Sequence, residues 1–445
     1  MPRPPKRPLS WVLALLAVGG IVVPVLAQPQ PQEQGLPAQG EVIIDVVNPS
    51  REPYKMAVPR PTGEMRAAEL LAVTTRNDLG FTGSIEVIPE RSYHADLQAE
   101  GLGIQQQAWS SIGAQGVIKG EARSLGGDRV EIELRMYEVA RPAEPVVTKV
   151  YTATLDEVRV VAHRFCNEVM RYFNGHSGSF GSRLAFSRRV SKGVKEIFTV
   201  DFDGFGQRQV TQNGSINLLP NFGPRGSLYY TSFLGGNAEL WCTGRNRPLL
   251  SFPGPSMGAV LSPDAAKMAV SLSGDGNPEI YVGSPDGTSM SRFTNNAAID
   301  VSPTWSPDSR RIAWISDRHG SPQIFVQSAD GTGEPRRVTY RGGFNQSPSW
   351  CPRTDADIIV FTGVTGARSS DIFSVNVATG DIMRLTSGLG RAGDPYCSPD
   401  GRLVAFSSDQ GDGGIYIMTI WGGRVTKVVS GHAENVRWST KVPDP

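Results

Sequence analysis

From about residue 180 onward, short runs of apolar residues alternate with turn residues at a regular interval. The middle of one run falls at Phe186, Tyr230, Val270, Trp314, Phe361 and Phe406, so the unit repeats every 40–47 residues. A second apolar run follows in each unit, at residues 196–200, 239–241, 279–282, 323–326, 371–375 and 415–418. A period of this length is typical of the four-stranded blades of a β-propeller. The pattern therefore predicts six blades.

The residues around these runs fit the same interpretation. Ser-Pro-Asp precedes the first run at residues 262–264, 306–308 and 398–400, with partial copies at 351–352 and 223–224. Turns with Asp-Gly or Thr-Gly follow the second run, and glycine suits them because tight hairpins need positive φ. A short strand with a basic residue then closes the unit at 208–211, 292–294, 337–339 and 384–386. Charge on an outermost strand discourages pairing between molecules.

The first unit lacks an innermost strand, and the end of the sequence supplies a candidate for it. Asn435 to Ser439 matches the start of the innermost strand in the other units. We expect this segment to complete the first blade and to close the ring, which removes an open edge. The expected fold is mainly β, with a six-bladed β-propeller over residues 178–440 that follows a smaller α/β domain.

The α/β pattern covers residues 41–174. Strands are expected at 42–47, 85–88, 115–121, 130–139 and 146–152, and a helix at 66–78. The best-marked element is a helix at 155–173, because its apolar side chains fall on one face at helical spacing. Thr154 and Glu157 predict a capping box at its start. Gly175 to Gly178 then marks the boundary with the propeller.

The first 27 residues have the order of a secretory signal. Arg3, Lys6 and Arg7 precede an apolar run from Trp11 to Leu26. Val25-Leu26-Ala27 closes the run in the small-x-small pattern of a signal peptidase site, and the sequence turns polar at Gln28. A membrane anchor is the alternative, but the run contains two Gly and a Pro and falls short of the roughly 20 residues that a bilayer helix needs. We expect cleavage between Ala27 and Gln28. No Cys follows the run, which argues against a lipid anchor, and residues 28–40 form a Gln/Pro-rich arm.

Charge and cysteine content narrow the function classes. The 44 Lys and Arg residues balance 43 Asp and Glu residues. This balance gives no electrostatic footprint for nucleic acid or for an anionic membrane surface. Cys166, Cys242, Cys351 and Cys397 show no metal-type spacing, so we expect four free buried thiols. A disulfide between Cys351 and Cys397 is the alternative, because export permits disulfides.

Motifs for catalysis or metal binding are weak. Gly254 to Gly258 matches the G-x-S-x-G pattern, but it leads into a propeller strand rather than lying between a strand and a helix. His163 lies within the amphipathic helix, where packing or an interface hydrogen bond is the simpler role. Asp201 to Gly204 lacks the remaining ligand positions of a calcium loop, so we expect a hairpin turn there. No cofactor and no metal is predicted.

Once both parts are considered together, the chain resembles the TolB family of the Tol-Pal system. The most specific stretch runs from Val161-Ala162-His163-Arg164-Phe165 to Phe180-Gly181-Ser182-Arg183-Leu184-Ala185-Phe186, and it is similar to the junction between the two domains of that family. Residues 113–120 and 56–59 also resemble family segments. The resemblance covers about residues 41–440. The long arm at 28–40 is a departure from the family pattern.

The resemblance implies a non-catalytic periplasmic adaptor that binds Pal, an outer-membrane lipoprotein, and works with TolA in envelope integrity and cell division. TolA contact is expected through the N-terminal region. The chain enters the ring at a second strand, so the loops that lead into the innermost strands stay free for Pal. The expected contacts are Pro255, Ser256, Ile299, Asp300, Val301, Ser302, Asn345, Gln346, Ser347, Gly393, Asp394, Ala433 and Glu434.

Asp300 and Asp394 stand out in this set, because carboxylates at a channel mouth can steer a basic partner. Changing both to Arg is expected to weaken binding without lowering the melting temperature. Two rival functions remain open at this point: a propeller hydrolase with scattered catalytic carboxylates, and a carbohydrate-binding propeller.

Overall fold

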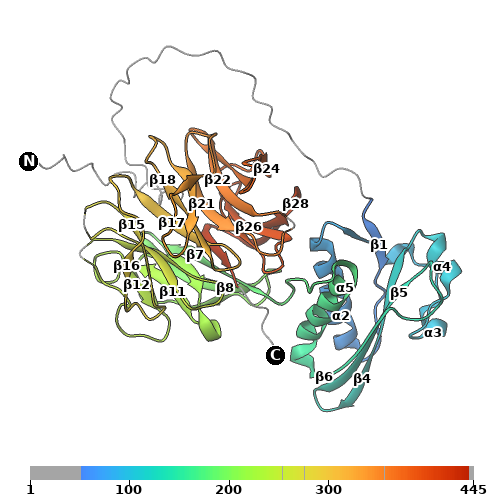
Figure 1. The fold of residues 1–445 in the computed structure, drawn as a ribbon. Helices are drawn as coiled ribbons and strands as arrows, with labels where there is room; N and C mark the ends of the chain where they lie inside the picture. Colours follow the sequence, from blue (N-terminus) through green and yellow to red (C-terminus); the bar gives the residue numbers. More distant parts are fainter. Residues whose placement is uncertain (1–51, 253, 275, 355, 440–445) are drawn as a thin grey trace, which may run out of the picture.

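The computed structural model describes residues 52–439 apart from 253, 275 and 355. An α/β domain is followed by a six-bladed propeller, and the two lie side by side (Figure 1). The expected signal, its cleavage point, the arm and the strand at 42–47 lie outside the described residues. Within residues 52–439, no helix is long and apolar enough to cross a membrane.

The α/β domain is built on one mixed sheet. Its strands are β1 (Tyr54–Ala57), β2 (Thr62–Gly63), β3 (Ile85–Val87), β4 (Gly116–Gly126), β5 (Arg129–Glu138) and β6 (Val147–Thr154). The main order is β3-β1-β4-β5-β6, with β1 parallel to both of its neighbours and β4 to β6 forming an antiparallel meander. The helices are α2 (Met65–Phe81), α3 (Leu97–Glu100), α4 (Gln106–Ser111) and α5 (Val158–Asn174), with short 3-10 turns η2 (Glu90–Ser92) and η3 (Leu155–Glu157).

Helices α2 and α5 pack against each other and bury their apolar faces in the core. The predicted capping box begins the helical segment, because the Glu157 carboxylate accepts both the N–H and the hydroxyl of Thr154 at 2.9 Å. Gly175 ends α5 with a φ of 75°, and its N–H donates to the Arg171 carbonyl. Both ends of this helix therefore follow the sequence prediction.

The propeller has six sheets, numbered here from the one that the chain enters first, with each given from the innermost strand outward. Blade 1 is β29 (Ala433–Trp438), β7 (Arg183–Ser191), β8 (Val194–Asp201) and β9 (Arg208–Gln209), and blade 2 is β10 (Asn217–Phe222), β11 (Leu228–Ser232) and β12 (Glu239–Cys242). Blade 3 is β13 (Ser256–Leu261), β14 (Met268–Leu272), β15 (Glu279–Gly283) and β16 (Ser291–Arg292). Blade 4 is β17 (Asp300–Trp305), β18 (Arg311–Ser316), β19 (Gln323–Ser328) and β20 (Arg336–Arg337). Blade 5 is β21 (Asn345–Trp350), β22 (Ile358–Gly366), β23 (Ser369–Asn376) and β24 (Ile382–Arg384), and blade 6 is β25 (Gly393–Cys397), β26 (Leu403–Ser408), β27 (Gly414–Thr419) and β28 (Gly422–Ser430).

The last strand closes the ring. Strand β29 pairs antiparallel with β7, with Trp438 opposite Leu184. Trp438 is buried, and its indole N–H donates to the Ser182 hydroxyl at 2.6 Å. Six blades and closure by the C-terminal strand are therefore confirmed.

The Ser-Pro-Asp motif makes the turn from the innermost strand to the second strand. In blade 4 the Ser306 hydroxyl donates to Asp308 at 2.5 Å and accepts the backbone N–H of Arg311 at 2.8 Å. The same pairing recurs between Ser262 and Asp264 and between Ser398 and Asp400. The motif recurs because it satisfies the backbone of a tight turn.

The cysteine prediction is wrong for one pair. Cys351 and Cys397 form a disulfide, with Cα atoms 5.3 Å apart, while Cys166 and Cys242 are free. Cys351 directly follows β21, and Cys397 is the last residue of β25, the innermost strand of the next blade. The ring therefore brings them together although they are 46 residues apart in sequence.

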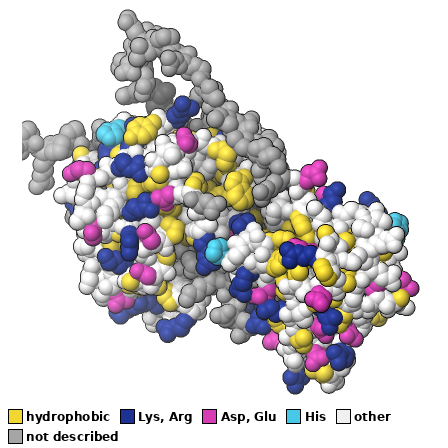
Figure 2. Space-filling model, turned by 45° about the vertical axis from the view of Figure 1, so that its right-hand side comes forward, with side chains coloured by type: hydrophobic (Ala, Val, Ile, Leu, Met, Phe, Trp, Pro, Cys, Tyr) yellow, Lys and Arg dark blue, Asp and Glu magenta, His cyan; other side chains and the backbone are white. Residues whose placement is uncertain are grey.

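The α/β domain packs on one rim of the propeller. We call this the docked rim; the Ser-Pro-Asp turns and the turns that follow the third strands lie there. Phe81 of α2 contacts Phe202 of blade 1 edge-to-face, at a centroid distance of 5.4 Å. Between the domains is a groove of about 800 Å³ whose walls include Phe173 and Trp421, and Figure 2 shows apolar side chains on both sides of this junction. The opposite rim, where the innermost strands begin, is the open rim, as the sequence predicts.

Candidate functional site

The innermost strand of every blade has one residue in the left-handed backbone region, at the same position of the repeat. In each blade the register with the second strand shifts at this residue, which marks a β-bulge. Several are followed by proline, which lacks the N–H that a regular ladder would use. The six residues, with φ between 50° and 65°, are Leu219, Gly258, Ser302, Ser347, Asp394 and Asn435.

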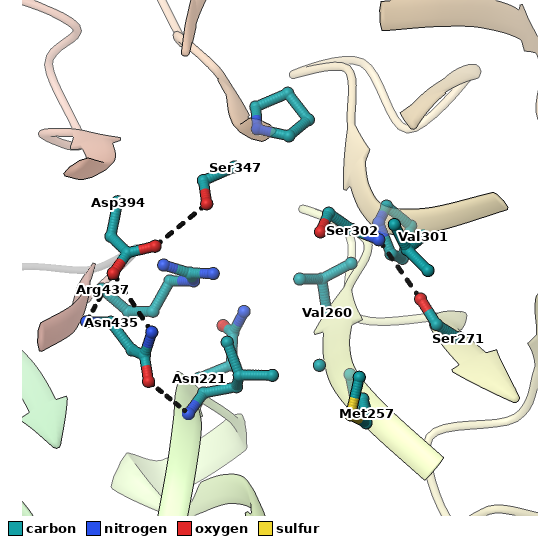
Figure 3. A pocket seen from close by; sticks show the side chains of 15 residues that line it. Asn221, Met257, Val260, Ser271, Val301, Ser302, Ser347, Asp394, Asn435 and Arg437 are labelled. Carbon is teal, nitrogen blue, oxygen red and sulfur yellow. Dashed lines mark hydrogen bonds between the residues drawn. The ribbon is translucent and has the colours of Figure 1, made fainter. Parts of the chain in front are cut away.

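These bulges surround a cavity of about 50 Å³ at the centre of the ring. The cavity has two unlike sides (Figure 3). One side carries the apolar side chains of Met257, Val260 and Val301 together with Ser271 and Ser302, and the other is wholly polar where it is labelled, with Ser347, Asp394, Asn435 and Arg437. The volume is enough for a few water molecules or the tip of one side chain and is well below that of a typical small-molecule pocket.

Asp394 links the blades on the polar side. One carboxylate oxygen accepts the Ser347 hydroxyl at 2.9 Å, and the other accepts the backbone N–H of Asn435 at 2.9 Å and its amide at 3.1 Å. The amide oxygen of Asn435 accepts the N–H of Leu219 at 3.3 Å. This chain of bonds runs from blade 5 through blades 6 and 1 to blade 2. The Asp394 carboxylate is therefore already engaged within the ring.

Asp300 differs from the sequence expectation of an accessible carboxylate at the channel mouth. It is 0% exposed and forms an ion pair with Arg318 at 3.0 Å, and the Asn296 amide donates to it at 2.7 Å. Burial raises the pKa of Asp300, although Arg318 and the hydrogen bonds oppose that shift. A change of Asp300 to Arg would bury two like charges, so the expectation of an unchanged melting temperature does not follow.

The remaining predicted contacts also gather at the open rim. Glu434 is half-buried and pairs with Lys195, and burial raises its pKa. Asn345 is buried, and its amide donates to Gln323 at 2.9 Å. Half-buried positions are Pro255, Ser302, Ser347 and Glu434, and the buried ones are Ser256, Ile299, Asp300, Val301, Asn345, Gln346, Gly393, Asp394 and Ala433. The predicted set therefore forms the wall of the channel mouth rather than its exposed surface.

Sequence reasoning missed the exposed residues of the open rim. Tyr340 is 68% exposed in the loop between β20 and β21, where its hydroxyl donates to the Arg337 carbonyl and the Arg337 guanidinium lies 4.8 Å from the ring centre. Further exposed apolar residues lie on the hairpins between second and third strands, near the ends of β7 and β22 and in the β11–β12 loop: Val190, Val364 and Leu234. Exposed basic residues lie in the same loops: Lys192, Arg341 and Arg368. Loop position alone would have identified them, since hairpin tips project beyond the blades.

The three sequence features that could have suggested catalysis or metal binding form a strand start, a turn and an ion-pair cluster. Ser256 is buried at the start of β13, so the G-x-S-x-G match does not form a nucleophile turn. Asp201 to Gly204 forms the expected turn between β8 and β9, with the Phe205 N–H donating to Asp203 at 3.2 Å. Among the described residues, one group of three side chains has the types that bind metals, namely Asp78, His163 and Asp203. Its members already pair with one another or with Arg159, as an ion-pair cluster does.

Both domains of the chain are similar to known proteins. One family model, described as the TolB amino-terminal domain, matches residues 42–144, and another, the TolB beta propeller domain, matches residues 171–367. A Tol-Pal system protein TolB of Gluconobacter oxydans is 30% identical over 447 residues, which cover 98% of this chain and 94% of the relative. One of Anaeromyxobacter dehalogenans is 36% identical over 303 residues, 66% of this chain and 67% of the relative. The crystal structure of TolB from Acinetobacter baumannii has the same fold, with a TM-score of 0.76 at 22% identity over 87% of this chain and 97% of that chain.

Proposed function

The chain belongs to the TolB family of Tol-Pal system proteins, and from that premise we propose that it is a non-catalytic adaptor whose open rim binds a Pal-type outer-membrane lipoprotein. The observation that carries the proposal is that the α/β domain covers one rim of the propeller and leaves the other rim free. The α/β domain packs on the docked rim through contacts such as Phe81 with Phe202. The open rim keeps a ring of bulges, a small central cavity and projecting apolar and basic residues.

The accessible chemistry of the open rim favours a partner that presents apolar and acidic side chains. Tyr340 offers a large aromatic face held in place by Arg337, and such anchors give much of the binding energy at protein interfaces. Arg341 follows Tyr340 in the sequence, and Arg368 lies in the β22–β23 loop of the next blade; both are exposed and can pair with carboxylates. Asp300 and Asp394 belong to the wall of the channel mouth. Their carboxylates already bind Arg318 and Ser347 inside the ring.

The location and the remaining partners follow from the same premise. The secretory signal predicted at residues 1–27, with cleavage between Ala27 and Gln28, would deliver the protein to the periplasm, where both an outer-membrane lipoprotein and TolA are within reach. Contact with TolA is assigned to the N-terminal region. Through these contacts the protein would support outer-membrane integrity and constriction at cell division.

A binding experiment with a matched control tests the proposal. The soluble domain of the Pal-type lipoprotein from the same organism is titrated against the wild type and against Tyr340→Ala, with calorimetry as the readout. We expect affinity to fall about 30-fold, since removing an aromatic anchor costs about 2 kcal/mol. Leu125→Ala is the control, because Leu125 is 51% exposed on the β4–β5 hairpin of the other domain.

The outcomes separate the proposal from its rivals. Equal affinity of the Tyr340→Ala and Leu125→Ala variants would move the contact away from this part of the open rim. No binding of the lipoprotein by the wild type, together with binding of a glycan or turnover of a peptide or glycoside substrate, would favour a carbohydrate-binding or hydrolytic propeller. Arg341→Glu adds a second test, because reversal of a contacting charge should slow association and raise its salt dependence.

A further inference from the structure

A buried cluster of charged side chains lies where the two domains meet on the docked rim. Asp78 comes from α2, Arg159 and His163 come from α5, and Asp203 comes from the turn between β8 and β9 of blade 1. Atoms of Asp78, His163 and Asp203 that can bind a cation all lie within 4.8 Å of one another. The open-rim contact proposed above does not involve these residues.

The contacts inside the cluster join the domains. Arg159 forms an ion pair with Asp203 at 2.5 Å across the domain boundary, with the Asp203 side chain only 3% exposed. Its guanidinium also lies 4.0 Å from the ring centre of Phe205, the residue that follows the same turn. On the other side it donates to the Thr74 hydroxyl at 3.3 Å. Arg159 therefore holds the blade 1 turn against the two helices.

His163 is the member of the cluster whose ordinary pKa lies near neutral pH. Burial raises the pKa of Asp78, and the neighbouring His163 opposes that shift. The Nδ1 atom of His163 lies 2.7 Å from an Asp78 carboxylate oxygen, and both side chains are buried. With His163 protonated, two carboxylates face two cations, and the cluster is neutral. Loss of that proton leaves an uncompensated negative charge at a buried interface, which is unfavourable.

We propose that this cluster is a proton-dependent latch between the domains, holding them together when His163 is charged and releasing the blade 1 turn when His163 is neutral. The other titratable groups that face the cluster are Cys166 on α5 and Asp201 at the end of β8, and Arg183 on β7 pairs with Asp201 at 3.6 Å. The Asp201–Arg183 ion pair has no net charge, so it leaves the net charge of the cluster unchanged.

The direction of the pH dependence follows from the contacts. Burial alone lowers the pKa of His163, but the carboxylates of Asp78 and Asp203 outweigh burial, and the net pKa is raised. Separation of the domains would take Asp203 away from His163 and leave Arg159 nearby. Both effects lower the pKa of His163 in the separated state. Docking is therefore strongest below the pKa of the separated state and weakens as pH rises through the raised pKa of the docked state.

Hydrogen exchange at the blade 1 turn reports the latch directly. In the docked state the N–H groups of Asp201, Gly204 and Phe205 are hydrogen-bonded within the turn. Exchange of the peptide that covers this turn is followed by mass spectrometry from about pH 6 to about pH 9, a range that spans the titration of a histidine with a raised pKa. After correction for intrinsic rates, we expect protection of the turn to fall several-fold across the range.

Two variants test the assignment. His163→Gln keeps a donor toward Asp78 without the charge, so its protection should be low and flat with pH. His176→Gln is the matched control, because His176 is exposed in the segment between the domains, and its profile should equal that of the wild type. A His163→Gln profile that follows the wild type would overturn the latch.

A second measurement keeps the proposal testable if His163→Gln fails to fold. The imidazole of His163 is followed by NMR in wild-type protein with labelled histidine, of which the chain has five. Its titration should coincide with the loss of protection at the blade 1 turn. A His163 that stays in one charge state while protection changes would refute the latch, whatever the outcome of the lipoprotein titration.

Discussion

Trp438 gives the sharpest test of how the ring closes. It lies on the last strand, is 1% exposed, stacks on Phe202 at a centroid distance of 6.4 Å, and donates its indole N–H to Ser182. Replacing a fully buried Trp by Ala costs about 3–5 kcal/mol through lost burial and the cavity left behind. The lost hydrogen bond adds about 1 kcal/mol. We therefore expect Trp438→Ala to destabilise the protein by about 4–6 kcal/mol, a large part of the 5–15 kcal/mol typical of a folded protein.

Equilibrium unfolding in urea, followed by far-ultraviolet circular dichroism, measures this loss. A thermal scan should show the melting temperature lowered by about 5 °C, because the entropy of unfolding is about 0.9 kcal/mol/K for a chain of this size. Trp421→Ala is the matched control, because Trp421 is 46% exposed and the same atoms are removed. Trp438→Phe should lie between the two, since it keeps an aromatic ring and loses the N–H. If Trp438→Ala costs no more than Trp421→Ala, the last strand does not close blade 1 in solution.

Two further predictions concern the ring. Replacing both Cys351 and Cys397 by Ser should destabilise the protein by about 4 kcal/mol in urea unfolding, which is the chain-entropy value for a loop of this length. Equal stability of the wild type with and without reductant would contradict this prediction. Asp300→Ala should lower the stability by about 2–3 kcal/mol, because it leaves Arg318 mostly buried and without its carboxylate. Glu334→Ala is the control and should change the stability little, because Glu334 is exposed. Equal effects of the two variants would contradict the burial of the Asp300–Arg318 pair.

The repeat could be predicted from the sequence because each blade carries the same local signals. Apolar runs, Ser-Pro-Asp turns and glycine turns recur at one period, and local rules act on neighbouring residues. The capping box of Thr154 and Glu157 is of the same kind. The short strand β1 and the helices α3 and α4 were missed, because four to six residues are too few to show a period.

The candidate site was harder to predict, because burial at the open rim depends on neighbouring blades. Asp300 and Asp394 occupy nearby positions of the same repeat, and both read as polar loop residues in the sequence. One pairs with Arg318 within its own blade, and the other bonds to Ser347 and Asn435 on the blades to either side. The disulfide was misjudged for the same reason, since Cys351 and Cys397 meet only once the ring has formed.

The polar side of the cavity includes residues of the strand that closes the ring, since Asn435 and Arg437 both lie on β29. Blade 1 takes its innermost strand from the end of the chain, so no covalent link passes through β29 into β7. The seam of the ring therefore lies within blade 1, where backbone pairing joins β29 to β7. Asp394 of blade 6 holds β29 in place on the open rim through the backbone and amide of Asn435. The α/β domain covers the same two blades on the docked rim, with Asp203 in blade 1 and the Thr419 side chain in blade 6 close to Gly83. A loss of lipoprotein binding on mutation of Asp394 would therefore reflect a weakened seam as readily as a lost contact, which is why the exposed Tyr340 is the better probe of the partner surface.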